Sequence, residues 1–136
     1  MIQRIQSVWL LLAATCIALT VKLPYYSGTN AKAVASYELK ATENFLLFGT
    51  TIVTGLLALL IIFLYKKRPL QLRLCVLGIA LEALLIFLYY REVITFTQDT
   101  YSLWAILHGL TVTLFFLAAR AINKDEKLIK DSDRLR

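Results

Sequence analysis

Apolar residues gather in four long runs that alternate with polar connectors along the 136-residue chain. The runs cover residues 8–23, 45–65, 74–90 and 101–119. A helix of about 20 mostly apolar residues is long enough to cross a hydrocarbon core of about 30 Å. The pattern therefore predicts an all-α transmembrane protein with four spans, over residues 6–23, 45–65, 72–90 and 101–121.

The connectors indicate how the four spans are joined. Residues 66–73 and 91–100 are short connectors, so spans two and three, and spans three and four, are expected to be antiparallel neighbours. The connector 24–44 is the longest: Pro24 ends the first helix, residues 27–30 predict a turn, and residues 31–39 fit either a strand or a surface helix. The simplest closure is an up-down four-helix bundle that forms one membrane domain, residues 1–136.

The tail, residues 122–136, has a helical pattern of its own. Ile122, Leu128, Ile129 and Leu135 recur at near-helical spacing, and basic residues lie between them. This pattern predicts an amphipathic helix at the membrane interface, with Glu126 and Lys130 paired at i,i+4. The alternative is a solvated tail that frays.

Aromatic residues cluster at the ends of the apolar runs. Trp9 and Tyr65 lie at one end of their runs, and a larger group lies at the other, namely Tyr25, Tyr26, Tyr89, Tyr90, Tyr101 and Trp104. Tyr and Trp at such positions anchor helices at the level of the lipid headgroups. Packing inside the bundle is the alternative.

Composition agrees with a membrane protein, since 59% of the residues are hydrophobic and only 18% are charged. Four spans and their connectors use nearly the whole chain, which leaves no room for a soluble catalytic domain. The first run resembles a signal peptide, but no small-x-small site precedes a polar start, so we expect it to be retained as a span. Both cysteines lie in apolar runs, which does not fit a disulfide framework.

The basic residues are unevenly distributed across the predicted membrane. Eleven of the fifteen Lys and Arg residues lie on the side shared by the N-terminus, the second connector and the tail. Short loops rich in Lys and Arg remain in the cytoplasm, so we expect both termini to be cytoplasmic. Basic residues beside spans attract anionic lipid headgroups, so the net charge of +6 indicates lipid or protein contact and not nucleic-acid binding. The candidate contact residues are Arg4, Lys66, Lys67, Arg68, Arg73, Lys124, Lys127, Lys130, Arg134 and Arg136.

Two ionisable residues lie within the apolar runs. Glu82 is near the middle of the third run and His108 is in the fourth, and helix geometry places them at similar depth. By the same count of residues along each helix, Thr54 and Thr15 lie at a similar depth, which predicts a midplane polar layer of four residues. Such a layer either fixes helix register by hydrogen bonding or forms a proton or ion site.

Three segments resemble a known family. They are residues 1–11, MIQRIQSVWLL, residues 65–75, YKKRPLQLRLC, and KDEKLIK at 124–130 followed by DRLR at 133–136. In these segments the chain resembles the domain-of-unknown-function family DUF4293, which implies a small four-span membrane protein of Bacteroidota-type bacteria. The resemblance implies no activity, cofactor or catalytic residue.

These features favour a non-enzymatic protein of the bacterial inner membrane. We expect an accessory or scaffold subunit that presents its basic cytoplasmic face to anionic lipid or to a membrane or cytoplasmic protein partner. The alternative is a small channel or proton-coupled transporter that uses Glu82 and His108, and a membrane enzyme is a third class. No zinc-spaced His/Cys cluster, phosphate loop or nucleophile elbow occurs in the sequence, so we expect no cofactor.

Overall fold

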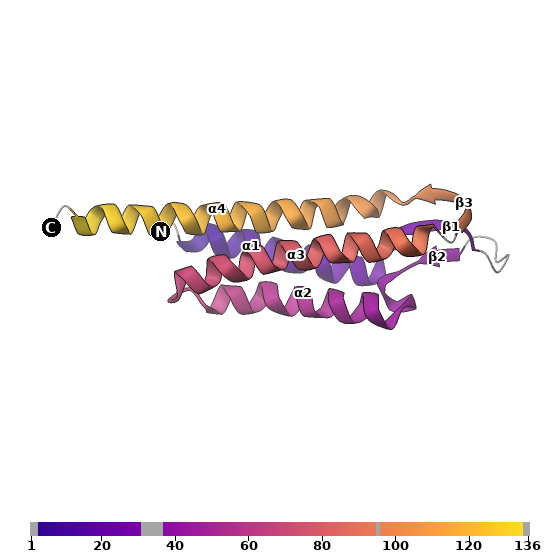
Figure 1. The fold of residues 1–136 in the computed structure, drawn as a ribbon, viewed down its shortest axis with the longest axis horizontal. Coiled ribbons are helices and arrows are strands. Elements are labelled where there is room, and N and C mark those ends of the chain that lie inside the picture. Colours follow the sequence, from indigo (N-terminus) through magenta and orange to yellow (C-terminus); the bar gives the residue numbers. More distant parts are fainter. Residues whose placement is uncertain (1–2, 31–36, 95, 135–136) are drawn as a thin grey trace.

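Four long helices form an antiparallel bundle (Figure 1) in the computed structural model, which describes residues 3–30, 37–94 and 96–134. The helices are α1 (Gln3–Lys22), α2 (Phe45–Phe63), α3 (Arg68–Val93) and α4 (Ile106–Arg134). Helices α1 and α3 each pack against both α2 and α4, which closes the bundle into a ring. All four are long and apolar enough to cross a membrane. The prediction of an all-α, up-down transmembrane bundle is confirmed, and the protein is a multi-pass membrane protein.

The helix ends follow local sequence signals. Helix α2 begins after Asn44, whose Oδ1 accepts a hydrogen bond from the backbone N–H of Leu46 at 3.2 Å, as expected of an N-cap residue. Helix α3 has a proline, Pro69, in its first turn, where the missing N–H costs nothing. It therefore starts four residues before the predicted position 72. Helix α4 starts five residues after the predicted position 101.

A three-stranded antiparallel sheet caps one end of the bundle. Its strands are β1 (Tyr26–Asn30), β2 (Tyr37–Leu39) and β3 (Phe96–Tyr101), in the order β2-β1-β3. Tyr26 lies opposite Leu39 on one side and opposite Tyr101 on the other. The prediction of a turn at residues 27–30 is wrong, because Ser27 and Gly28 pair with both neighbouring strands and the next two residues pair with β3. Of the segment 31–39, residues 37–39 form a strand and residues 31–36 lie outside the described residues.

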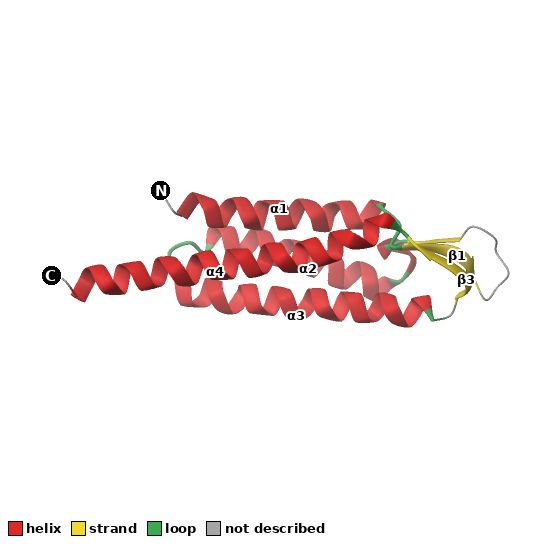
Figure 2. Ribbon diagram, turned by 90° about the horizontal axis from the view of Figure 1, so that it is seen from above, coloured by secondary structure: helices red, strands yellow, loops and turns green. Residues whose placement is uncertain are grey.

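The sheet and the chain termini lie at opposite ends of the molecule (Figures 1 and 2). Two 3-10 turns, Ala41–Glu43 and Leu103–Ala105, lead from the sheet into α2 and α4. The second of these, together with Tyr101 at the end of β3, occupies residues that the sequence assigned to the fourth span. We call the end that carries the sheet the sheet end and the opposite end the terminal end.

Helix α4 continues beyond the other helices at the terminal end (Figure 1). The amphipathic tail predicted for residues 122–136 is helical up to Arg134, and residues 135–136 lie outside the described residues. The predicted ion pair is present, with Lys130 Nζ 2.7 Å from Glu126 Oε1. The tail extends α4 in line with the bundle instead of forming a separate helix across it.

Two apolar clusters fill the bundle. The larger joins all four helices towards the terminal end and includes Leu10, Ile61, Cys75 and Phe115. The smaller lies under the sheet and consists of Tyr26, Leu39, Ala41, Leu47, Leu85, Tyr89 and Val93. On α3, the buried Glu82 falls between Cys75 of the first cluster and Leu85 of the second. A polar group therefore separates two apolar regions of the core.

Candidate functional site

Glu82 and His108 contact each other inside the bundle. The Nδ1 atom of His108 lies 2.7 Å from Oε1 of Glu82, and the side chains are 3% and 1% exposed. At this distance one proton is shared, carried either by the carboxyl oxygen or by the ring nitrogen. Oε2 of Glu82 has no hydrogen-bond partner among the described residues. The pair therefore has a spare acceptor in an otherwise apolar region.

Two tyrosines cover the His108 ring. The rings of Tyr25 and Tyr89 stack with centroids 4.3 Å apart, and they lie 5.4 Å and 5.1 Å from the His108 ring. Burial raises the pKa of the Tyr25 phenol, and nearby Tyr101 raises it further, so Tyr25 is neutral at physiological pH. The prediction that Tyr89 anchors at headgroup level is wrong, because its side chain is buried in the smaller apolar cluster. The same holds for Tyr26.

His108 lies nearer the sheet end than the sequence predicted. His108 is in the first turn of α4, and Tyr25, which contacts its ring, follows the end of α1. The sequence assigned a deeper position because it began the fourth span at Tyr101, which belongs to β3. Glu82 reaches His108 from near the middle of α3.

The two threonines predicted for the same layer do not join it. Thr15 is exposed, and its hydroxyl donates to the Leu12 carbonyl oxygen at 2.8 Å. Thr54 is buried, but its hydroxyl donates to the carbonyl oxygen of Thr50 in its own helix, at 2.8 Å. The polar site therefore consists of one carboxyl group, one imidazole and their aromatic cover.

Close packing of α3 against α4 holds the pair in position. A Cβ atom added at Gly78 would lie 2.7 Å from Cε1 of Phe115 and 2.9 Å from its Cζ. Gly78 lies one turn from Glu82, and Phe115 lies two turns from His108. All four residues are buried, so Gly78 shares the inward face of α3 with Glu82, and Phe115 shares that of α4 with His108.

A second buried polar cluster lies at the terminal end. Gln6 of α1 donates a hydrogen bond from Nε2 to Oδ2 of Asp125 on α4. Nη1 of Arg68 approaches the backbone oxygen of Asp125 at 3.4 Å. Nε2 of Gln71 donates to the carbonyl oxygen of Ile61 at 3.1 Å. The first two contacts tie α1 and α3 to the point where α4 leaves the bundle, and the third joins α3 to α2.

The sequence contained a signal for this second cluster. Gln6 precedes Leu10, Ala13 and Ile17, all buried, at helical spacing, and Asp125 follows the buried Ala118 and Ile122 in the same way. Helical spacing therefore placed both polar residues on buried faces.

The predicted basic residues form a rim around the terminal end. Arg68 is partly buried, whereas the side chains of Lys66, Lys67, Arg73, Lys124, Lys127, Lys130 and Arg134 are exposed. Lys66 Nζ also lies 5.9 Å from the ring centroid of Tyr65. The side chain of Arg4 and the whole of Arg136 lie outside the described residues.

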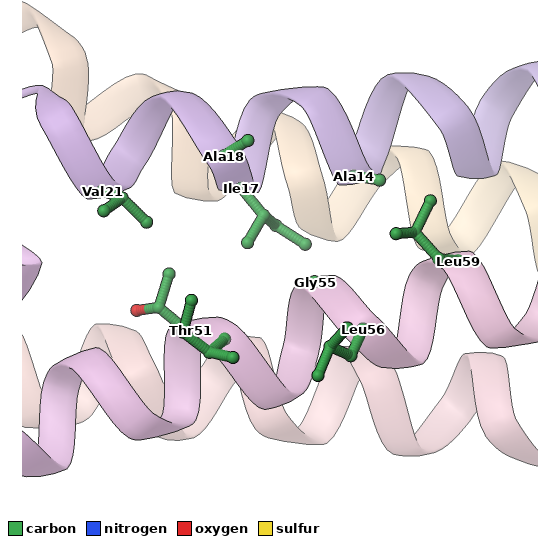
Figure 3. A pocket seen from close by; sticks show the side chains of 9 residues that line it. Ala14, Ile17, Ala18, Val21, Thr51, Gly55, Leu56 and Leu59 are labelled. Atoms are coloured by element: carbon green, nitrogen blue, oxygen red, sulfur yellow. The ribbon is translucent and has the colours of Figure 1, made fainter.

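An apolar groove of about 200 Å³ runs along the bundle between α1 and α2 (Figure 3). Small residues open it: Ala14 and Ala18 lie on α1, and Gly55 lies on α2. The one hydroxyl among its lining residues, that of Thr51, already donates to the Leu47 carbonyl oxygen at 2.7 Å. The groove therefore offers apolar contacts and no free polar group for catalysis or for binding a polar ligand.

Within the described ranges, no three His, Cys, Asp or Glu residues lie close enough to hold a metal ion.

No curated protein and no solved structure matches the chain. A family model does match, over residues 2–135, and its description is Domain of unknown function (DUF4293). With nearly the whole sequence covered, the chain belongs to the DUF4293 family.

Proposed function

We propose that this protein is a non-enzymatic accessory or scaffold subunit of the bacterial inner membrane, with both termini in the cytoplasm. It presents the basic rim and the end of α4 to anionic lipid or to a protein partner. The observation that carries the proposal is the extension of α4, which runs beyond the bundle as a straight helix (Figure 1). A helix end that projects past the other helices suits contact with another molecule.

The side chains of the extension support a protein contact. Leu128 and Ile129 are 48% and 45% exposed, although they lie beyond the four apolar spans predicted from the sequence. Lys127, Lys130 and Arg134 surround them. A helix with adjacent apolar and basic residues matches the helix-in-groove mode of recognition, in which the partner supplies an acidic, apolar groove.

The orientation rests on charge. The basic rim and both chain termini lie at the terminal end, and eleven of the fifteen Lys and Arg residues belong to that side. The positive-inside rule favours the cytoplasm for this end. The sheet would then face the periplasm.

Affinity purification in mild detergent tests the scaffold role. The full chain should retain a stoichiometric partner, and Leu128→Asp combined with Arg134→Glu should lose it. Lys40→Glu, which changes an ion-paired residue at the sheet end, is the control and should retain it. Purification of a homo-oligomer alone, unchanged by the tail variants, would contradict the proposal.

The alternative, a small channel or proton-coupled transporter, is favoured by one observation. The Glu82–His108 pair is buried, and Oε2 of Glu82 has no partner within the described part of the chain. Ionisable pairs inside a membrane commonly relay protons. Proton flux into proteoliposomes, abolished by Glu82→Gln and retained by Thr15→Ala, would support transport. Equal flux in both variants would exclude this pair from it.

A further inference from the structure

A basic pocket lies at the terminal end, between the α2–α3 turn and helix α4. Its volume is about 270 Å³, and its lining residues are Lys66, Arg68, Pro69, Glu126, Ile129 and Lys130. The turn contributes Lys66, the start of α3 contributes Arg68 and Pro69, and α4 contributes the others. The pocket therefore forms only because α4 continues past the end of the bundle.

The pocket has an excess of positive charge. Three cations line it against one carboxyl group, and Oε1 of that group, on Glu126, is already held by Lys130 at 2.7 Å. In the described segments, no carboxylate lies within ion-pair distance of Lys66 or Arg68. The Arg68 side chain is oriented by its contact with the Asp125 carbonyl oxygen at 3.4 Å. A guanidinium held in place beside two lysines suits a phosphate group.

The N-terminus of α3 adds to this field. The helix begins at Arg68, inside the pocket lining, and no side chain of the described residues caps it. The first N–H groups of a helix carry partial positive charge. This partial charge is positive, like the charges of the three side chains, so it also favours a phosphate group.

Apolar residues beside the pocket point to a lipid and not to free phosphate. Pro69 and Ile129 line it, and Phe63 and Leu70 are 78% and 40% exposed near the same turn. Free phosphate would use the cations alone. A phospholipid would use the cations for its phosphate and the exposed apolar residues for its chains. The turn joins two spans, so the pocket lies where headgroups meet hydrocarbon.

We propose that this pocket binds the phosphate of an anionic phospholipid, with Lys66, Arg68 and Lys130 as its ligands. The inference rests on the proposed function only in that it assigns a ligand to part of the basic rim. Lipid binding at this pocket helps to fix the end of α4 relative to the turn. The residues beyond it, including Arg134, remain available for a protein partner.

Native mass spectrometry of the purified full chain tests the proposal. Phosphatidylglycerol, added to the protein in neutral detergent, should give a one-lipid complex, and phosphatidylcholine should bind more weakly. Each cation removed should weaken phosphatidylglycerol binding about five-fold, since each contributes about 1 kcal/mol near a charged membrane surface. Arg68→Gln combined with Lys130→Gln should therefore weaken it about 25-fold.

The matched control is Lys22→Gln combined with Arg91→Gln, which removes two exposed cations at the sheet end that belong neither to the pocket nor to the basic rim. Equal affinity in the two double variants would overturn the proposal. Lys66→Gln with Lys130→Gln leaves the Arg68–Asp125 contact intact and replaces the first variant if that one does not fold.

A second arm separates the two sources of phosphate. Inorganic phosphate at millimolar concentration should not displace phosphatidylglycerol from the protein. Displacement by inorganic phosphate would overturn the assignment to a lipid. Neither arm depends on a protein partner, so the scaffold proposal can fail while this one stands.

Discussion

The contact between Glu82 and His108 shows what a buried polar group requires in this bundle. Helical spacing placed both residues on buried faces, and the antiparallel connection of α3 and α4 made them neighbours. The structure joins them at 2.7 Å. Only one carboxyl oxygen gains a partner among the described residues. The pair therefore orders the two helices, but Oε2 of Glu82 forms no hydrogen bond with the described residues.

Removing the His108 ring should lower the free energy of unfolding more than a conservative change of Glu82 does. His108→Ala leaves the Glu82 carboxyl group without a partner, so the free energy of unfolding should fall by about 1–3 kcal/mol. Glu82→Gln can still hydrogen-bond to the ring, so the loss should stay near the average of about 0.6 kcal/mol for such bonds in membranes. Equilibrium unfolding in mixed micelles, followed by tryptophan fluorescence, measures both. A His108→Ala protein as stable as the parent would contradict this account.

Glycine is required at position 78 because the Phe115 ring lies too close for a larger residue. A Cβ atom there would lie 2.7 Å from Phe115, which is fully buried and has no room to move. Gly78→Ala should therefore lower the free energy of unfolding by about 1–3 kcal/mol, the usual cost of overpacking.

Two further variants isolate the cause. Phe115→Leu in the Gly78→Ala background should recover part of the lost stability, because the smaller side chain withdraws the clashing atoms. Gly109→Ala is the control, since its added Cβ meets nothing within 4 Å. It should leave stability unchanged or raise it by up to about 1 kcal/mol through helix propensity. Equal losses at the two glycines would exclude contact with Phe115 as the reason.

At the scale of elements, the helices could be predicted and the sheet could not. Four long apolar runs fix the number and order of the helices, because each must satisfy its own backbone in lipid. Strand β1 has no apolar alternation and contains a Gly-Thr-Asn sequence typical of turns, and β2 is only three residues long. They are stabilised by pairing between residues far apart in sequence, such as Tyr26 with Tyr101. Local patterns carry no information about such pairing.

Thr15 was misplaced for a different reason, the direction of its side chain. Counting residues along a helix gives depth to within about one turn, but it does not give the direction of a side chain around the axis. Thr15 has the depth of a mid-bundle residue and points outwards. Its neighbour Cys16 points into the core.

The point where α4 leaves the bundle should depend on Asp125. Asp125→Ala removes the acceptor for the buried Gln6 amide, so the free energy of unfolding should fall by about 1–3 kcal/mol. Lys124→Ala, one residue away and exposed, should change it by no more than about 0.5 kcal/mol. Thermal unfolding of the two purified variants compares them. Equal stabilities would mean that the Gln6–Asp125 contact does not hold α1 to α4.

For the molecule as a whole, the main consequence is an asymmetry between its two ends. One end carries a sheet, and the other carries the basic rim, the contacts of Asp125 with Gln6 and Arg68, and the projecting end of α4. If the terminal end is cytoplasmic, all the surfaces proposed for lipid and partner contact face the same compartment. The orientation can be measured directly with single cysteines.

Cysteine labelling in spheroplasts and in inverted membrane vesicles should report opposite sides for the two ends. Cys16 and Cys75 are both buried, so an impermeant maleimide should give little background. Glu38→Cys, exposed in β2, should react from the periplasmic side of spheroplasts, and Lys67→Cys in the α2–α3 turn should react only in inverted vesicles. Both positions are exposed, so burial does not explain a difference between them. The reverse pattern would place the basic rim outside the cytoplasm, against the rule that excess Lys and Arg remain inside, and would remove the basis for the proposed inner-face contacts.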